Sequence, residues 1–272
     1  MTFGSVFGRT FSPTFQPKSQ AVSAGAWTPR SISGCLLWLD FSDTDTLFTD
    51  AGSTKVVNDG DLIYQANDKS GNSNHATQAT ESKRLPYKVN IQNSLGAALG
   101  TFGSTAATYM THPVLVSDPT ALTLFFAATK ATSPAANLLW AHRSETTRLI
   151  QLNIENNSKY TMQLRGSGNI LQAVSNTSCD TTLDAIYTAK FDKTNDSHYV
   201  WFNTSASAEN TYDFGSETFT STKDVLFASY NGSTYASSFG GYVYEVIIYN
   251  SALSDTDRGK VETYLNNKWA IY

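Results

Sequence analysis

The segment 240–254, with the sequence GGYVYEVIIYNSALS, decides how the domain closes. From Tyr242 to Tyr249 every residue except Glu245 is β-branched or aromatic. Such residues pack well on a pleated surface that is covered on both faces. The segment therefore predicts a long and largely buried strand that carries one carboxylate.

A helix is predicted directly after this strand. Ser254 stands three residues before Asp257, which resembles a capping box, so its hydroxyl can accept an N–H of the first helical turn. The helix then has one largely apolar face, because four residues recur at helical spacing: Val261, Tyr264, Leu265 and Lys268. We expect this face to dock on another surface of the protein.

Two motifs near the ends of the chain carry a family resemblance. The first is CLLWLD at 35–40 followed by NDKSGNSNHAT at 67–77, and the second is G-x-V-x-E-V-x-I-Y-N-x-A-L-S at 241–254 followed by YLNNKW at 264–269. Both resemble laminin-G-like, concanavalin A-like jelly-roll domains, which are common in bacteriophage structural proteins. The resemblance brackets roughly residues 34–270 and implies a β-sandwich without naming a ligand, because this fold hosts lectins, glycosidases and packing modules.

Short apolar runs separated by turn residues fill the region between the motifs. They lie at 122–128, 137–141, 148–154, 160–164, 185–191 and 199–202, and turns are expected at 166–169 and 231–233. Many strands without intervening helices favour an antiparallel sandwich. We therefore predict an all-β antiparallel jelly roll over residues 33–272, with an extended N-terminal arm at 1–32 and a short C-terminal helix.

Composition excludes several function classes. Charged residues make up 15% of the 272 residues and the net charge is −4, so nothing resembles a basic footprint for nucleic acid. No apolar run is long enough to cross a bilayer, and residues 1–9 lack the pattern of a signal peptide. We expect synthesis in a cytoplasm, with free, buried thiols at Cys35 and Cys179, and a virion as the final location.

The arm is unusual because it combines aromatic residues with prolines. Phenylalanines recur every four residues while Pro13 and Pro17 forbid a continuous helix, and the proposed anchors are Phe3, Phe7, Phe11, Phe15 and Trp27. Such an arm has no core of its own. It either docks on another subunit, which we favour, or wraps back over its own sandwich.

An acidic cluster near the first motif raises the question of calcium. The candidate ligands are Asp40, Asp43, Asp45 and Asp68, since calcium takes six to eight oxygens from flexible loops. Aspartates are also ordinary turn formers, and no EF-hand spacing is present. Turn chemistry is the favoured interpretation, and no other cofactor is expected.

Catalytic constellations are weak in this sequence. The Glu-x-Asp-x-x-Glu motif of jelly-roll glucanases is absent, and Glu245 stands alone, although glycoside hydrolysis needs two carboxylates. Its favoured role is that of a buried carboxylate hydrogen-bonded to the backbone or to a Lys or Arg. No nucleophile elbow or phosphate-binding loop occurs, so no enzymatic activity is expected.

The best stretch for sugar contact is 230–235, where Tyr230, Asn231 and Tyr235 combine aromatic faces with an amide. Aromatic residues in strands also serve as core or cross-strand pairs. We expect a non-enzymatic virion protein of a tailed bacteriophage, anchored by its arm to capsid or tail subunits. The alternative is a carbohydrate-binding or adhesion module that recognises host glycans. A homo-oligomer is expected, with a trimer as the candidate symmetry.

Overall fold

The computed structural model describes residues 27–102, 107–130, 137–144, 148–155, 159–165, 170–176, 183–206, 210–230, 235–236 and 238–272. The phenylalanines of the arm and the two predicted turns at 166–169 and 231–233 lie outside these ranges. No helix in the described part has the length and apolar character needed to span a bilayer.

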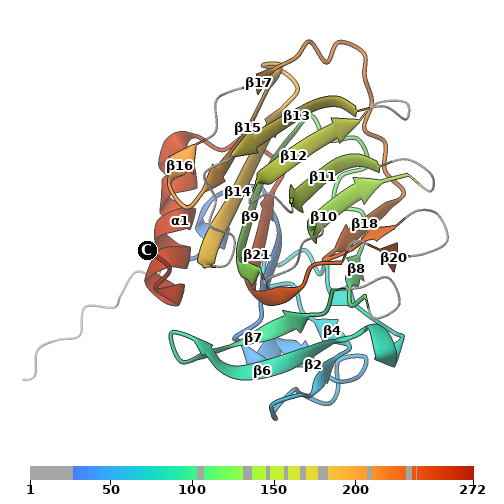
Figure 1. The fold of residues 1–272 in the computed structure, drawn as a ribbon, viewed down its shortest axis with the longest axis vertical. Helices are drawn as coiled ribbons and strands as arrows, with labels where there is room; N and C mark the ends of the chain where they lie inside the picture. Colours follow the sequence, from blue (N-terminus) through green and yellow to red (C-terminus); the bar gives the residue numbers. More distant parts are fainter. Residues whose placement is uncertain are drawn as a thin grey trace, which may run out of the picture.

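The described chain folds into two large antiparallel sheets that face each other, with one α-helix at the side (Figure 1). The ten-stranded sheet holds β1 (Cys35–Asp40), β3 (Leu62–Ile63), β6 (Leu85–Gln92), β7 (Leu95–Gly100), β9 (Ala121–Lys130), β14 (Asp184–Asp192), β15 (Ser197–Phe202), β16 (Ser205–Ala206), β17 (Asn210–Thr211) and β21 (Gly241–Tyr249). The predicted sandwich is confirmed.

The second sheet has nine strands and forms the opposite layer of the sandwich. Its members are β2 (Leu47–Phe48), β4 (Gln65–Ala66), β5 (Ala76–Thr77), β8 (Met110–His112), β10 (Asn137–Arg143), β11 (Arg148–Ile154), β12 (Tyr160–Arg165), β13 (Ile170–Asn176) and β18 (Lys223–Leu226). A separate pair is formed by β19 (Ser229–Tyr230) and β20 (Tyr235–Ala236). Each of the six apolar runs found in the sequence corresponds to a strand, three in this sheet (β10, β11 and β12) and three in the ten-stranded sheet (β9, β14 and β15).

Strand β21 lies in the middle of the ten-stranded sheet, as its composition predicts. One edge pairs with β9, and the other pairs first with β7 and then with β1. The β1 pairing joins Trp38 to Ile247 and Asp40 to Glu245, so the two motifs of the sequence are neighbours in the sheet.

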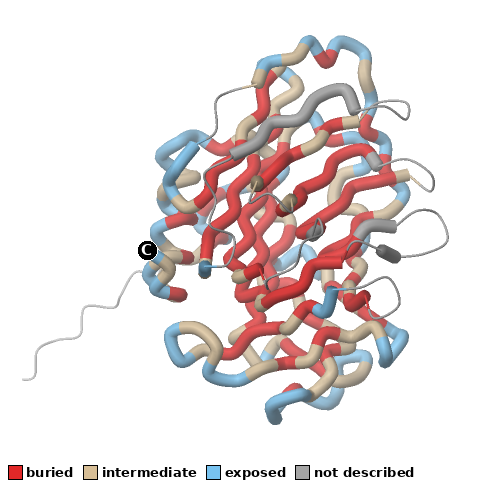
Figure 2. The backbone as a smooth tube through the Cα atoms, viewed as in Figure 1, coloured by how far each residue is buried: buried red, intermediate tan, exposed pale blue. Residues whose placement is uncertain are grey.

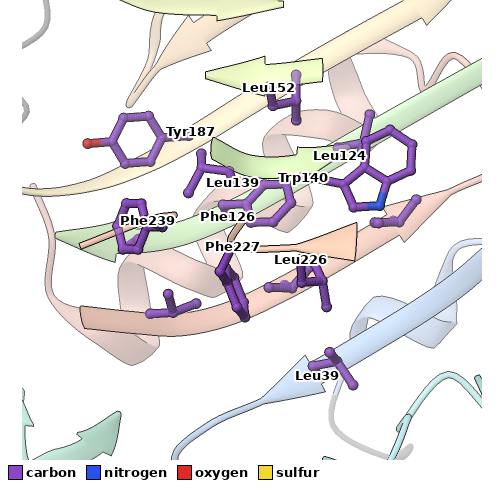
Figure 3. Close-up of a cluster of buried hydrophobic side chains, with 14 of the residues drawn as sticks. Leu39, Leu124, Phe126, Leu139, Trp140, Leu152, Tyr187, Leu226, Phe227 and Phe239 are labelled. Carbon is purple, nitrogen blue, oxygen red and sulfur yellow. The ribbon is translucent and has the colours of Figure 1, made fainter. Parts of the chain in front are cut away.

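The main core fills the space between the sheets, where the buried segments concentrate (Figure 2). Figure 3 shows side chains from both layers meeting there, including Leu39, Phe126, Leu139, Leu152 and Tyr187. Fully burying a side chain of this size contributes about 1.5–3 kcal/mol. The alternation of inward and outward side chains along each strand is what makes one face available to this core.

Helix α1 (Asp255–Trp269) covers part of the outer face of the ten-stranded sheet (Figure 1). Its Ser254 hydroxyl accepts a hydrogen bond from the Asp257 N–H at 3.1 Å, which confirms the predicted cap. Val261, Leu265 and Trp269 are fully buried in a second apolar cluster against the sheet. The predicted docking face is therefore confirmed, and it extends to Trp269.

One histidine lies in the core without a described polar partner. His198 of β15 is 0% exposed, its ring lies 6.1 Å from that of Phe214, and neither ring nitrogen has a hydrogen-bond partner. Burial disfavours the charged imidazolium and lowers the pKa of His198 from 6.5 to about 4.

This pKa predicts a loss of stability in acid. Because the folded-state pKa of His198 lies below the unfolded value, its contribution is fully present above pH 6.5 and is lost as the pH falls through about 4. The variant His198→Phe should lack this part of the pH dependence. Urea unfolding at pH 4 to 8 measures it, and an unchanged pH profile of the variant would show that folding does not lower the pKa of His198.

Candidate functional site

The carboxylate of Glu245 is buried between β21 and α1. A β-bulge falls between Val243 and Glu245 where β21 pairs with β9. Val243 and Val246 belong to the core between the sheets, whereas Tyr244 belongs to the cluster under the helix. Since a bulge adds one residue on one strand, Glu245 follows Tyr244 onto the same outer face instead of entering the core.

Four donors surround this carboxylate. Its Oε1 accepts from Trp38 Nε1 at 2.6 Å and from the Tyr264 hydroxyl at 2.8 Å. Its Oε2 accepts from Trp269 Nε1 and from Lys268 Nζ, both at 2.9 Å. The predicted role of Glu245 as a buried, hydrogen-bonded carboxylate is therefore correct, and the donors come from β1 and α1.

A chain of ion pairs continues from Glu245 to the loop after β1. Lys268 Nζ lies 2.6 Å from Asp40 Oδ1, and Lys69 Nζ bridges Asp40 and Asp43 at 2.9 and 2.6 Å. Burial raises the pKa of Glu245, and Asp40 adds to this effect while Lys268 opposes it. Burial acts in the same direction on Asp40, but Lys268 and Lys69 outweigh it and hold the pKa of Asp40 below its usual value.

The DKSGN motif forms a tight turn around Asp68. The Asp68 carboxylate accepts from the N–H groups of Trp38, Ser70 and Asn74 at 2.8–3.0 Å and from the Ser70 hydroxyl at 2.7 Å. Gly71 has a φ of +97°, a region that favours glycine. The motif therefore fastens its own loop to β1.

The four aspartates proposed as calcium ligands do not form a metal-binding group. Asp40 and Asp43 bind Lys69, Asp45 binds the exposed Lys55 at 2.6 Å, and Asp68 accepts from the backbone. Among the described residues, no three His, Cys, Asp or Glu side chains are placed to hold a metal ion. Turn and ion-pair chemistry accounts for these carboxylates.

The other predicted site residues are placed as follows. Trp27 contacts its own chain, with its ring centroid 5.7 Å from that of Tyr264 on α1. The backbones of Tyr230 and Tyr235 pair with each other in the β19–β20 hairpin, while their side chains and Asn231 lie outside the described part. Cys35 is a free thiol, as expected, but it is half-buried and not fully buried, and Cys179 lies outside the described residues.

A row of polar side chains that sequence reasoning missed lies on the nine-stranded sheet. Along β11, Ile150 and Leu152 enter the core, so the alternating Gln151 and Asn153 face away from it. Gln151 pairs with Gln163 of β12, and Asn153 pairs with Thr161. The period-two alternation in residues 150–154 is the signal that could have identified this row.

Two amide oxygens in this row are buried without a donor. Gln151 is 1% exposed and Asn153 is 5% exposed, yet Gln151 Oε1 and Asn153 Oδ1 have no hydrogen-bond partner in the structure. The buried Nε of Arg165, further along β12, also lacks a partner. A buried polar group left unpaired costs about 1–3 kcal/mol, so three of them on one sheet face make this face a candidate for binding a polar group.

Comparisons with known proteins bear on the fold. No protein-family model matches the chain, and no curated protein matches it in sequence. The carbohydrate-binding module CBM40 of the Ruminococcus gnavus IT-sialidase, bound to α2,3-sialyllactose, is similar with a TM-score of 0.50 and 18% identity, covering 65% of this chain and 97% of that one.

A second solved structure is similar over more of the chain. The ligand-binding domain of botulinum neurotoxin serotype D, in complex with N-acetylneuraminic acid, has a TM-score of 0.51 and 11% identity, covering 87% of this chain and 53% of that one. At these identities the likeness establishes the β-sandwich fold. What those proteins bind is a property of those proteins.

The Glu245 cluster predicts a large loss of stability on truncation. Glu245→Ala leaves two indole N–H groups and the Tyr264 hydroxyl without an acceptor, and removes one of the two carboxylates that Lys268 binds. We expect the free energy of unfolding to fall by about 3–5 kcal/mol, as for removal of one partner of a buried ion pair.

The control for this measurement is the exposed Glu81, for which Glu81→Ala should change the stability by about 0.5 kcal/mol or less. Glu245→Gln keeps one acceptor oxygen, so its loss of unfolding free energy should lie between those of Glu245→Ala and Glu81→Ala. Urea denaturation reports all three. If Glu245→Ala unfolds at the same urea concentration as the Glu81 control, the cluster does not hold α1 on the sheet.

Proposed function

We propose that this chain is a non-catalytic carbohydrate-binding module whose glycan contacts the outer face of the nine-stranded sheet. The single observation that carries this proposal is the pair of buried, unpartnered amide oxygens of Gln151 and Asn153. Sugar hydroxyls are neutral donors of suitable size. An acceptor that is already desolvated and fixed by its sheet loses little freedom when such a donor arrives.

The neighbouring positions supply complementary chemistry. Gln163 lies directly across from Gln151 and is half-buried, with an amide that both donates and accepts. Arg165 brings a guanidinium at the next outward position of β12, which suits a carboxylate or a hydroxyl. Ala141 and Val225 continue the same face with smaller side chains, and both are fully buried.

Two further observations support this function. The similar solved structures include a module bound to sialyllactose and a toxin domain bound to N-acetylneuraminic acid. Glu245, the one carboxylate in the C-terminal strand, has both oxygens engaged by four donors, which leaves it unsuited to act as an acid, base or nucleophile.

The display of this module on a virion is the second part of the proposal. It is supported by the resemblance of the two terminal motifs to phage structural domains and by the aromatic residues of segment 1–32. In this arrangement Phe3, Phe7, Phe11 and Phe15 bind capsid or tail subunits, because aromatic side chains commonly carry interface energy. A homo-oligomer on the particle multiplies weak glycan contacts through avidity.

Substitutions in the proposed site should weaken glycan binding without lowering the stability of the protein. Gln151→Leu and Asn153→Leu replace unpaired buried oxygens by apolar groups of similar size, so the variants should melt at the same temperature as the wild type or higher. Each change should weaken glycan affinity about threefold to tenfold, as expected for one lost hydrogen bond. A glycan array that includes α2,3-sialyllactose, followed by calorimetry, measures the affinity.

Gln78→Leu is the matched control, because Gln78 is a buried glutamine whose amide donates to Tyr109 O and accepts from Thr80 N–H. It should lower the melting temperature and leave glycan affinity unchanged. The proposal fails if no glycan binds, or if the Gln151 and Asn153 variants bind as the wild type does. Release of sugar from any array glycan would replace it with an enzymatic function.

A further inference from the structure

A groove of about 820 Å³ runs along α1 on the side of the molecule away from the nine-stranded sheet. Its lining includes Trp27, Thr256, Gly259, Thr263, Tyr264 and Asn267. The helical members recur every three or four residues, so they form one stripe along the helix. The volume falls within the range of about 300–1,000 Å³ that is usual for ligand sites.

Two aromatic rings form one wall of this groove at a fixed angle. Trp27 and Tyr264 are tilted by 54° with centroids 5.7 Å apart. Tyr264 cannot swing away, because its hydroxyl donates to Glu245 at 2.8 Å and its ring meets the edge of Trp38 at 6.2 Å. The Glu245 cluster thus holds an aromatic platform in place at the surface.

Gly259 opens the groove at the middle of α1. A Cβ added at this position would have no heavy atom within 4 Å. Glycine is less favourable than alanine inside a helix, and nothing packed against Gly259 requires the absence of a side chain. The missing side chain instead lets a ring approach the helix backbone next to the aromatic wall.

The polar groups in the groove are neutral or already paired. Lys260 binds Asp257 at 2.7 Å, Lys268 binds Asp40 and Glu245, and Asp255 lies 3.6 Å from Arg258. Thr256, Thr263 and Asn267 remain exposed along the stripe with hydroxyl and amide groups that both donate and accept. This combination fits an uncharged polyhydroxy ligand with apolar ring faces.

We propose that this groove is a second carbohydrate-binding site, which takes a neutral oligosaccharide stacked on Trp27 and Tyr264. One sugar ring lies over the aromatic wall and above Gly259, and its hydroxyls bond to Asn267 and Thr263. The site is separate from the one on the nine-stranded sheet and does not depend on it. Its ligand differs in charge, because the groove offers no unpaired cation among its lining residues, whereas the sheet carries Arg165.

The test uses the full chain and saturation-transfer NMR with neutral tetrasaccharides of β-linked glucose, galactose or N-acetylglucosamine. Gly259→Leu should weaken binding at least tenfold by filling the space above the helix, and Gly259→Ala should weaken it less. Both variants should melt no lower than the wild type, because each replaces a helical glycine. Asn267→Leu should weaken binding without filling the groove at Gly259.

The sheet variants Gln151→Leu and Asn153→Leu serve as the matched control, since they should leave neutral-sugar binding in the groove unchanged. Loss of binding in these variants but not in Gly259→Leu would overturn the proposal and leave the sheet site intact. An absence of any neutral-sugar binding would also overturn it. So would protection of residues 1–26 from proteolysis that Gly259→Leu abolishes, because the groove would then hold that segment instead of a sugar.

Discussion

The buried carboxylate of Glu245 is the constraint on which the remaining structure depends. A charge in a dry interior is costly unless every lone pair is matched, and here two indoles, a phenol and an ammonium match it. These donors come from β1 and α1 while the acceptor comes from β21. The first strand, the last strand and the helix therefore have to meet in one arrangement for the charge to be satisfied.

This constraint explains why two motifs far apart in the sequence act as one structural unit. The Trp38 indole donates to Glu245, while the Trp38 backbone N–H donates to Asp68 of the DKSGN turn. Lys69 of that turn binds Asp40, and Asp40 binds Lys268 of the helix. The two motifs therefore hold the first strand, the last strand and the helix together. Residues that resemble a metal-binding or catalytic cluster in the sequence stabilise the fold instead.

Because the charged side chains around Glu245 stabilise the fold, the groups proposed for ligand binding are mostly neutral. The charged side chains around Glu245 and along α1 are paired with one another. On the other sheet, the described residues include two buried amide oxygens without a donor, those of Gln151 and Asn153. An amide row on a sheet and an aromatic wall beside a helix are both surfaces that recognise shape and hydroxyl pattern. Such surfaces agree with the carbohydrate-binding alternative more closely than with a purely structural role.

Local sequence patterns were enough to predict seven of the strands, the capped helix and an antiparallel sandwich, because hydrophobic period and cap residues act over short distances. The apolar runs at 148–154 and 185–191 became β11 and β14, and Ser254 began the helix. The direction of Glu245 depended instead on long-range strand pairing, since a bulge between β21 and β9 placed it under the helix. The pairing of β11 with β12 likewise brought Gln151 opposite Gln163, and the contact of Trp27 with Tyr264 formed the groove. Neither could be predicted from the sequence, because local periodicity does not encode strand register or long-range contacts.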